Sequence, residues 1–220
     1  MSDDEQLLNQ AIRSMLADAK VCVQSLPQCH DISLWLVEPS AMQRQFSNEE
    51  MSQIQENPAY WGFCWASGQV LAREILANPH WVAGKKVMDF GAGSGVVAVA
   101  CVLAGAKEVI ACDIDPCALL ACAANARINQ VEFRLHPDLF AFEEPLDLLI
   151  AADVLYDKEN LPLLNTFLRK ATKVIIADSR IKNFNFPPYQ SFAQHESATV
   201  PDLDESDEFR FVNLYQAGSW

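Results

Sequence analysis

Residues 87–95 read Val-Met-Asp-Phe-Gly-Ala-Gly-Ser-Gly, and this stretch decides the fold. The apolar start predicts a buried strand, and the glycines predict a tight turn that opens a helix over 96–103. Glycine lets the backbone approach a ligand without a Cβ, and a helix N-terminus offers free N–H groups. A second apolar run, residues 109–112, ends at Asp113, where the next strand of a βαβ unit would end. An acid there can bind both hydroxyls of a ribose, so the sequence predicts a nucleotide-type cofactor site.

The spacing of the glycines favours S-adenosylmethionine over a dinucleotide. The dinucleotide fingerprint is G-x-G-x-x-G, whereas Gly91, Gly93 and Gly95 form G-x-G-x-G, with Asp89 two residues before the first glycine. A carboxylate beside a pyrophosphate would repel it, but the same carboxylate attracts the ammonium of a methionine moiety. A nicotinamide-dependent oxidoreductase is an alternative, but it needs a catalytic base late in the chain, where we find no good candidate.

The length, composition and net charge of the chain exclude several classes of protein and several kinds of partner. The chain has 220 residues, half of them apolar, which suits one globular α/β unit. No apolar run approaches the ~20 residues that span a bilayer, and the acidic N-terminus is unlike a targeting leader, so we expect a cytoplasmic protein without a membrane partner. The net charge of −13 and the lack of any Lys/Arg cluster argue against a nucleic-acid partner. The seven cysteines form no zinc-ligand pattern, so no metal is expected.

Strands alternate with helices from residue 86 onward, which predicts an α/β fold with a doubly wound, Rossmann-like sheet. Residues 81–220 are expected to form the cofactor-binding domain, and two final strands bring the sheet to seven. Residues 1–80 are expected to form an N-terminal extension of helices and a strand, which would cover the cleft and select the substrate. The expected strands are 32–37, 87–90, 109–112, 131–135, 146–152, 174–177, 197–200 and 209–216, and the expected helices are 5–17, 47–57, 67–76, 93–104, 116–128 and 159–171.

The carboxyl end of the strand over 146–152 is where catalytic residues are expected. Asp153 and Tyr156 follow this apolar strand, so both would lie at the rim of the cofactor cleft. Methyl transfer needs a neutral nucleophile held in line with the methyl group. Removal from water lowers the pKa of a lysine amine, while a carboxylate and a phenol oxygen orient it. The alternative role for Asp153 is a cap for the following helix.

Four segments occur in an order that resembles a known family. Together they are similar to the seven-strand, S-adenosylmethionine-dependent protein-lysine methyltransferases with a D-x-x-Y motif after the fourth strand. Within that family they resemble the group that methylates the beta subunit of electron transfer flavoprotein, with its bacterial homologues. The resemblance covers about residues 57–216, and its most specific parts are W-x-x-x-W-x-x-G-Q and D-x-x-Y. The four segments are residues 57–69, 89–95, 113–116 and 153–156.

The resemblance implies a set of contacts with the cofactor. Trp65 would touch it, Gly91 and Gly93 would line its methionine part, and Ala152 would lie under it. Trp61 and Trp65 are four residues apart, which predicts that they share one helical face.

The resemblance also implies that Asp153 and Tyr156 shape a channel for the lysine of a protein substrate. On the adenine side, Ile114 would pack on the ring face and Asp138 would accept from the adenine amine. One departure is clear after the fifth strand, where residues 178–180 read Asp-Ser-Arg in place of the family's D-P-x-R.

Other readings keep the fold and change the function. A ribosomal protein or a small amine could be the acceptor, since related enzymes share the glycine loop. A silent module that binds the cofactor without transferring a methyl group is a further alternative. The sequence does not determine the substrate lysine or the oligomeric state.

Overall fold

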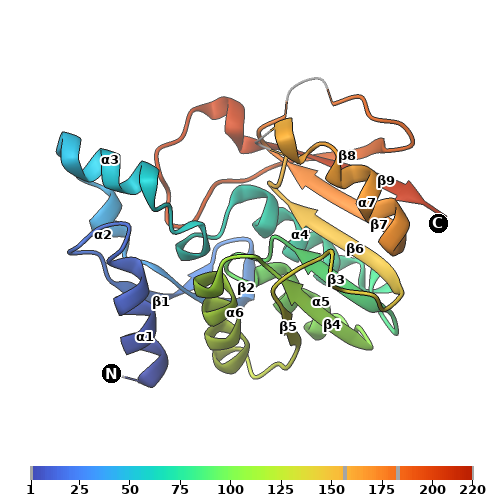
Figure 1. Cartoon of the computed structure of the whole chain (residues 1–220), viewed down its shortest axis with the longest axis horizontal. Coiled ribbons are helices and arrows are strands. Elements are labelled where there is room, and N and C mark those ends of the chain that lie inside the picture. The colour runs from blue at the N-terminus through green and yellow to red at the C-terminus, as the bar shows by residue number, and fades with distance from the viewer. Residues whose placement is uncertain (1, 156–157, 182–183, 220) are drawn as a thin grey trace.

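A computed structural model of the chain describes residues 2–155, 158–181 and 184–219. Its centre is a seven-stranded sheet with strand order β5-β4-β3-β6-β7-β9-β8 (Figure 1). The strands run parallel from β5 to β7, and β9 is antiparallel to both its neighbours. The order reverses between β3 and β6, which is where open α/β sheets bind ligands. The strands are β3 Lys86–Phe90, β4 Glu108–Cys112, β5 Arg134–His136, β6 Leu146–Ala152, β7 Ala171–Asp178, β8 Gln190–Glu196 and β9 Phe211–Gly218.

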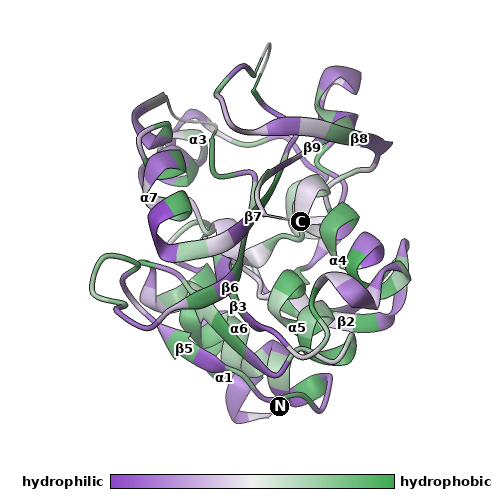
Figure 2. Cartoon of the chain, turned by 90° about the vertical axis from the view of Figure 1, so that its right-hand side faces the viewer, coloured by the Kyte–Doolittle hydropathy of each residue, from purple (hydrophilic) through white to green (hydrophobic). Residues whose placement is uncertain are grey.

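Helices cover both faces of the sheet, because successive strand residues point to opposite sides. In β3, Val87 belongs to one buried cluster with Val97 of α5, whereas Met88 belongs to another with Phe167 of α7. Figure 2 shows β6 and α5 as largely hydrophobic elements of the interior. The predicted doubly wound α/β fold is therefore confirmed. The helices that cover the sheet are α4 Ala66–Ala77, α5 Val96–Leu103, α6 Pro116–Ile128 and α7 Leu163–Lys170.

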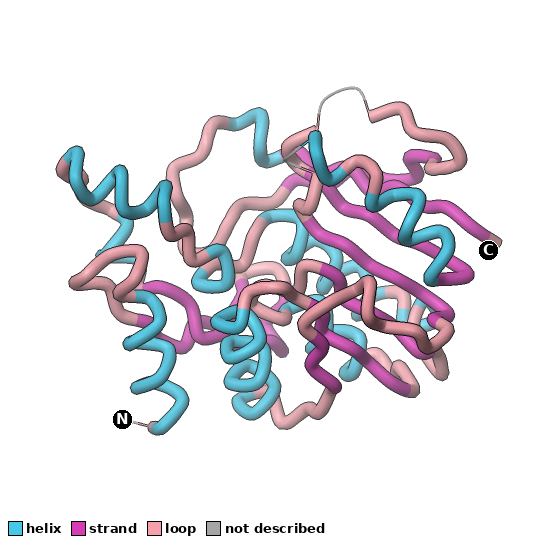
Figure 3. The backbone as a smooth tube through the Cα atoms, in the orientation of Figure 1, coloured by secondary structure: helices cyan, strands magenta, loops and turns pink. Residues whose placement is uncertain are grey.

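The N-terminal residues form a layer beside α6 (Figure 3). The Asn125 Oδ1 atom accepts from the Trp35 N–H at 2.7 Å, and the Asn129 Oδ1 atom accepts from the Ser33 N–H at 3.0 Å. Trp35 and Ser33 belong to β2, which forms a separate two-stranded sheet with β1. These bonds therefore tie that small sheet to α6, whereas α4 packs against α5 on the main sheet. The domain boundary at residue 80 stays a prediction. The elements of this layer are α1 Asp3–Ile12, β1 Val21–Leu26, β2 Cys29–Val37, α2 Pro39–Met42 and α3 Asn48–Glu56.

Several predicted elements differ from the structure: α7 begins at Leu163 rather than at residue 159, and strand β1 was not predicted. The first helix ends at Ile12 rather than at residue 17, and the third strand of the main sheet shifts to 134–136. The edge strand β8 covers 190–196, so the predicted strand over 197–200 is wrong, and Val200 makes an isolated bridge with Cys64. Strand β8 escaped prediction because it is a polar strand at the edge of the sheet, with mostly exposed side chains and no apolar alternation.

Among the described residues, no helix is long and apolar enough to cross a membrane. The same part of the chain contains no group of three or more His, Cys, Asp or Glu side chains that could hold a metal ion. The cysteines are free thiols. Cys112 and Cys122 are buried, as is typical of small core residues, whereas Cys117 on the same helix as Cys122 is only partly buried.

Candidate active site

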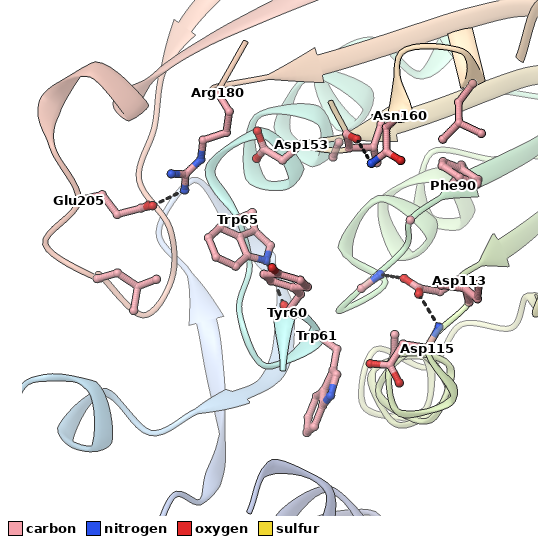
Figure 4. A pocket seen from close by; sticks show the side chains of 18 residues that line it. Tyr60, Trp61, Trp65, Phe90, Asp113, Asp115, Asp153, Asn160, Arg180 and Glu205 are labelled. Atoms are coloured by element: carbon pink, nitrogen blue, oxygen red, sulfur yellow. Dashed lines mark hydrogen bonds and ion pairs between the residues drawn. The ribbon is translucent and has the colours of Figure 1, made fainter. Parts of the chain in front are cut away.

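A cavity of about 670 Å³ lies at the carboxyl ends of the central strands (Figure 4). Cofactor sites commonly have volumes of roughly 300–1,000 Å³, so this one is large enough for a nucleoside-sized ligand. The turns after four neighbouring strands contribute to its wall, as predicted for the switch point of the sheet. Those wall residues are Phe90, Gly91, Gly93, Asp113, Ile114, Ala152, Asp153, Val154 and Arg180.

The glycine loop passes close to two other elements. Gly91 and Gly95 have φ values of +68° and +76°, which favour glycine. A Cβ on Gly91 would lie 2.9 Å from Val154 Cγ1, and one on Gly95 would lie 3.3 Å from Cys122 Cα. Positions 91 and 95 therefore favour glycine, because a side chain there would press against the turn after β6 or against α6. Gly91 and Gly93 line the cavity, whereas Gly95 lies beside it as the N-cap of α5.

The Asp113 carboxylate is held at the cavity by two backbone N–H groups. Its Oδ2 atom accepts from the Gly93 N–H at 2.9 Å, and its Oδ1 atom accepts from the Asp115 N–H at 2.9 Å. Burial raises the pKa of Asp113. Each carboxylate oxygen has a further lone pair, so this fixed acid can accept hydrogen bonds from ligand hydroxyls. That geometry fits the predicted ribose site.

Asp89 lies beneath the glycine loop and not in the cavity wall. Its side chain is buried, and its Oδ2 atom accepts from the Ala98 N–H at 3.0 Å, in the first turn of α5. Because the N-cap residue Gly95 has no side chain, Asp89 supplies the cap of this helix. Burial raises the pKa of Asp89 to about 7. Its predicted role beside a methionine ammonium stays a prediction.

The two residues assigned to the adenine side have different positions. Ile114 is 89% exposed and lines the cavity, so its side chain is available to a flat ring. Asp138 is not among the lining residues, and its Oδ1 atom accepts from the Phe140 N–H at 2.7 Å. The roles of both residues toward adenine stay predictions.

Aromatic residues before α4 form another wall of the cavity. Trp65 is the N-cap of α4, and its indole Nε1–H donates to the Tyr60 carbonyl at 3.0 Å. Its ring centroid lies 5.9 Å from that of Tyr60 and 5.6 Å from that of Phe63. Trp61 is almost fully buried in a 3-10 turn, η1 (Tyr60–Gly62). The expectation that Trp61 and Trp65 share one helical face is therefore wrong, because no helix joins them.

Asp153 lines the cavity and joins three segments. Its carboxylate accepts from the N–H and hydroxyl of Ser67, at 3.1 and 2.7 Å, and from the N–H and hydroxyl of Ser179, at 2.9 and 2.8 Å. The residue itself has a left-handed φ of +50°. Because Trp65 cannot cap α4, Asp153 caps that helix from the end of β6. Within the described residues, no hydrogen bond joins its carboxylate to the helix that follows it, which was its alternative predicted role. Tyr156, the other predicted catalytic residue, lies outside the described residues.

Several cavity residues were not predicted as functional, and two of them, Arg180 and Glu205, are charged. Arg180 follows β7, and its Nη2 atom forms an ion pair with the Glu205 carboxylate. Figure 4 shows this pair on the side of the cavity away from Asp113 and Asp115, with Trp65 between. The sequence Asp-Ser-Arg at residues 178–180, which differs from the D-P-x-R of the similar family, is the signal that could have identified Arg180. Glu205 belongs to the acidic segment 202–208, which has no periodic pattern and therefore no local signal.

Solved structures of methyltransferases share this fold. The ribosomal protein L11 methylase from Lactobacillus delbrueckii subsp. bulgaricus matches with a TM-score of 0.50 and 22% identity, over 70% of this chain and 79% of that chain. The magnesium protoporphyrin IX methyltransferase from Synechocystis PCC 6803, solved with bound SAH, matches with a TM-score of 0.52 and 15% identity. The match covers 80% of this chain and 90% of that chain. At these identities the likeness shows the fold alone.

Sequence comparisons extend the match to curated relatives. The family described as "Ribosomal protein L11 methyltransferase (PrmA)" matches residues 75–176. The electron transfer flavoprotein beta subunit lysine methyltransferase of Homo sapiens is 35% identical over 127 residues, which cover 54% of this chain and 48% of the human protein. The Danio rerio protein of the same name is 33% identical over 175 residues, which cover 76% of this chain and 67% of the Danio rerio protein. The chain thus spans from about half to two thirds of these relatives, and it belongs to the family of the electron transfer flavoprotein beta subunit lysine methyltransferases.

Proposed function

We propose that the chain is an S-adenosylmethionine-dependent methyltransferase that modifies a lysine side chain of a protein. The observation that carries this proposal is the Asp113 carboxylate, held by the Gly93 and Asp115 N–H groups at the mouth of a cavity at the switch point of the sheet. The names of the relatives point to the beta subunit of electron transfer flavoprotein as the first candidate substrate.

The described residues fit the cofactor in three places. Asp113 would accept the ribose hydroxyls, Gly91 and Gly93 would let the backbone approach the methionine part, and Ile114 would cover a ring face. When bound, S-adenosylmethionine would supply a methyl group on a positively charged sulfur. The Trp65 ring and the polar turn around Asp153 lie across the cavity from Asp113, so the acceptor amine would meet the cofactor there.

The chain must also make the acceptor amine reactive. A lysine amine is protonated in water, and only the neutral form is a nucleophile. The aromatic wall around Trp65 would exclude water from the amine and so lower its pKa, because desolvation penalises the charged form. The proton then leaves toward solvent before transfer.

A second candidate acceptor is ribosomal protein L11. The PrmA match supports it, but residues 75–176 include the glycine loop and β6 and exclude Tyr60, Trp65, Arg180 and Glu205. That match therefore concerns the cofactor half of the cavity, whereas the flavoprotein-methyltransferase relatives match over a longer part of the chain. We also propose a protein acceptor over a nucleic acid, because a net charge of −13 repels a phosphate backbone.

Binding and transfer can be tested in sequence. Calorimetric titration with S-adenosylhomocysteine should give saturable binding, and NAD should give none. Labelled methyl groups should then pass from S-adenosylmethionine to purified electron transfer flavoprotein and not to ribosomal protein L11. Labelling of L11 alone would replace the substrate, and binding without labelling of any protein in a lysate would indicate a small-molecule acceptor or a silent module. Absence of S-adenosylhomocysteine binding would overturn the proposal.

A further inference from the structure

The Arg180 guanidinium lies between two aromatic rings and a carboxylate. Its Cζ atom is 4.2 Å from the centroid of the Phe209 ring and 5.6 Å from that of the Trp65 ring. Its Nη2 atom pairs with Glu205 Oε1. Two aromatic faces and one acid make a site for an organic cation, since ring faces carry negative charge and the carboxylate adds a full charge. We call Trp65, Phe209 and Glu205 the cation cage.

Two of the three cage residues, Trp65 and Glu205, line the active-site cavity, as does Arg180, whereas Phe209 does not. The Arg180–Glu205 pair lies on the side of the cavity away from Asp113, with Trp65 between (Figure 4). A ligand whose ribose is held by Asp113 would therefore leave the cage facing the acceptor. The acceptor proposed above, a lysine side chain, carries an ammonium ion of the same charge as the guanidinium that now fills the cage.

We infer that the cation cage is the subsite that first receives the substrate's lysine ammonium, and that Arg180 fills it as an internal competitor which the substrate displaces. This inference rests on the proposed lysine methyltransferase function and adds how the acceptor is admitted. The cage binds the charged ammonium, because the Glu205 carboxylate and the ring faces favour that form. The pKa of the amine falls only after the amine has moved from Glu205 into the desolvated space beside the cofactor, where it loses its proton, so lysine is selected by its charge as well as by its length.

The contacts around the pair allow Arg180 to leave while the cage stays formed. The second Glu205 oxygen, Oε2, accepts from the Thr199 hydroxyl at 2.6 Å, so the carboxylate keeps an anchor without Arg180. The backbone of Arg180 is fixed separately, because its N–H donates to Asp178 Oδ1 at 2.7 Å. The Arg180 side chain is 24% exposed. Rotation of that side chain alone would therefore open the cage.

A purely structural role for the ion pair makes a different prediction. If Arg180 and Glu205 only tie the 199–210 segment to β7, removing either partner loosens the same segment and impairs binding in the same way. If Arg180 competes with the substrate, its removal improves binding of a cation, whereas loss of the Glu205 charge weakens it. The signs of the two effects decide between the roles.

The experiment compares three variants, each saturated with S-adenosylhomocysteine. Arg180→Ala and Glu205→Gln test the cage. Arg44→Ala is the matched control, because Arg44 also lies over a ring, Phe46 at 5.0 Å, and pairs with an acid, Glu50 at 2.6 Å, but outside the cavity. Nα-acetyl-lysine amide is titrated into each protein and followed by tryptophan fluorescence, with Nα-acetyl-norleucine amide as the uncharged probe. S-adenosylhomocysteine affinity is measured for every variant.

We expect Arg180→Ala to bind the lysine probe about three- to tenfold more tightly than the wild type, and Glu205→Gln to bind it more weakly by a similar factor. Arg44→Ala, the norleucine probe and S-adenosylhomocysteine affinity should show little change. Equal losses in both cage variants, or no gain in Arg180→Ala, would overturn the inference. Transfer to electron transfer flavoprotein is measured in parallel. A wild type that labels no protein, with the probe effects intact, would remove the proposed substrate and leave the cage standing.

Discussion

The carboxylate of Asp153 accepts two hydrogen bonds from Ser67, from the N–H at 3.1 Å and from the hydroxyl at 2.7 Å, although 86 positions separate the two residues. Two further bonds from Ser179 use the same carboxylate. One side chain therefore holds together the start of α4, the end of β6 and the turn after β7. Asp89, near the end of β3, likewise joins its strand to the start of α5, because it accepts from the Ala98 N–H. The cavity is built where acids at strand ends cap helices that begin beside them.

Asp153→Ala should cost the fold about 2–4 kcal/mol more than Asp204→Ala does. Both residues have a left-handed φ, +50° and +53°, so alanine brings similar backbone strain at both positions. Asp153→Ala alone leaves the buried Ser67 hydroxyl and two N–H groups without their acceptor. Urea unfolding of both variants measures the difference. Equal losses of unfolding free energy would mean that the carboxylate contributes little to the fold.

Asp113→Asn should weaken S-adenosylhomocysteine binding by about 1–3 kcal/mol, because the amide has one acceptor oxygen where the carboxylate has two. Asp138→Asn is the comparison, since Asp138 follows the neighbouring strand but does not line the cavity. We expect a much smaller loss for Asp138→Asn in calorimetric titration. A loss at Asp138 as large as that at Asp113 would instead support the predicted contact with the adenine amine.

Local sequence patterns predicted one helix start and three strands of the main sheet correctly. Ser47 and Glu50 form a reciprocal capping box, and α3 begins where that motif indicates. Strands β3, β4 and β6 match their predicted bounds to within one residue, because continuous apolar runs mark buried parallel strands.

Long-range contacts are what the sequence did not reveal. The caps of α4 and α5 come from Asp153 and Asp89, whereas their own N-cap residues are Trp65 and Gly95, which offer no capping oxygen. Glu205 reaches the cavity wall from a stretch that looks like an acidic surface loop. Such contacts depend on tertiary packing, which no spacing along the chain records.

The stability of the fold should fall as the pH rises through the range in which Asp89 loses its proton. Burial raises the pKa of Asp89 from 3.8 to about 7, so between these values the folded protein keeps a proton that the unfolded chain has released. The unfolded state then binds fewer protons, and the free energy of unfolding decreases with pH. Asn at position 89 cannot ionise, and its Oδ1 atom can still accept from Ala98.

Urea titrations of the wild type and Asp89→Asn, from about pH 5 to about pH 8, measure this contribution. The stability of the wild type relative to the variant should decrease across that range. The comparison removes the effect of Asp178, whose pKa burial also raises. The charge of Asp113 contributes to the raised pKa of Asp89, so that coupling is part of the measured difference. A difference that stays constant with pH would mean that Asp89 ionises in the folded protein as it does in the unfolded chain.

Gly91→Ala should reduce S-adenosylhomocysteine affinity by at least about tenfold, whereas Gly84→Ala should leave it unchanged. Both glycines have positive φ, +68° and +72°, so an alanine is strained at either position, by about 1–2 kcal/mol. The surroundings differ, because a Cβ on Gly84 meets open space and one on Gly91 comes within 2.9 Å of Val154 Cγ1. Adding Val154→Ala to Gly91→Ala removes that atom and should restore part of the affinity. If the double variant binds no better than Gly91→Ala, backbone strain in the loop, and not the contact with Val154, limits the site.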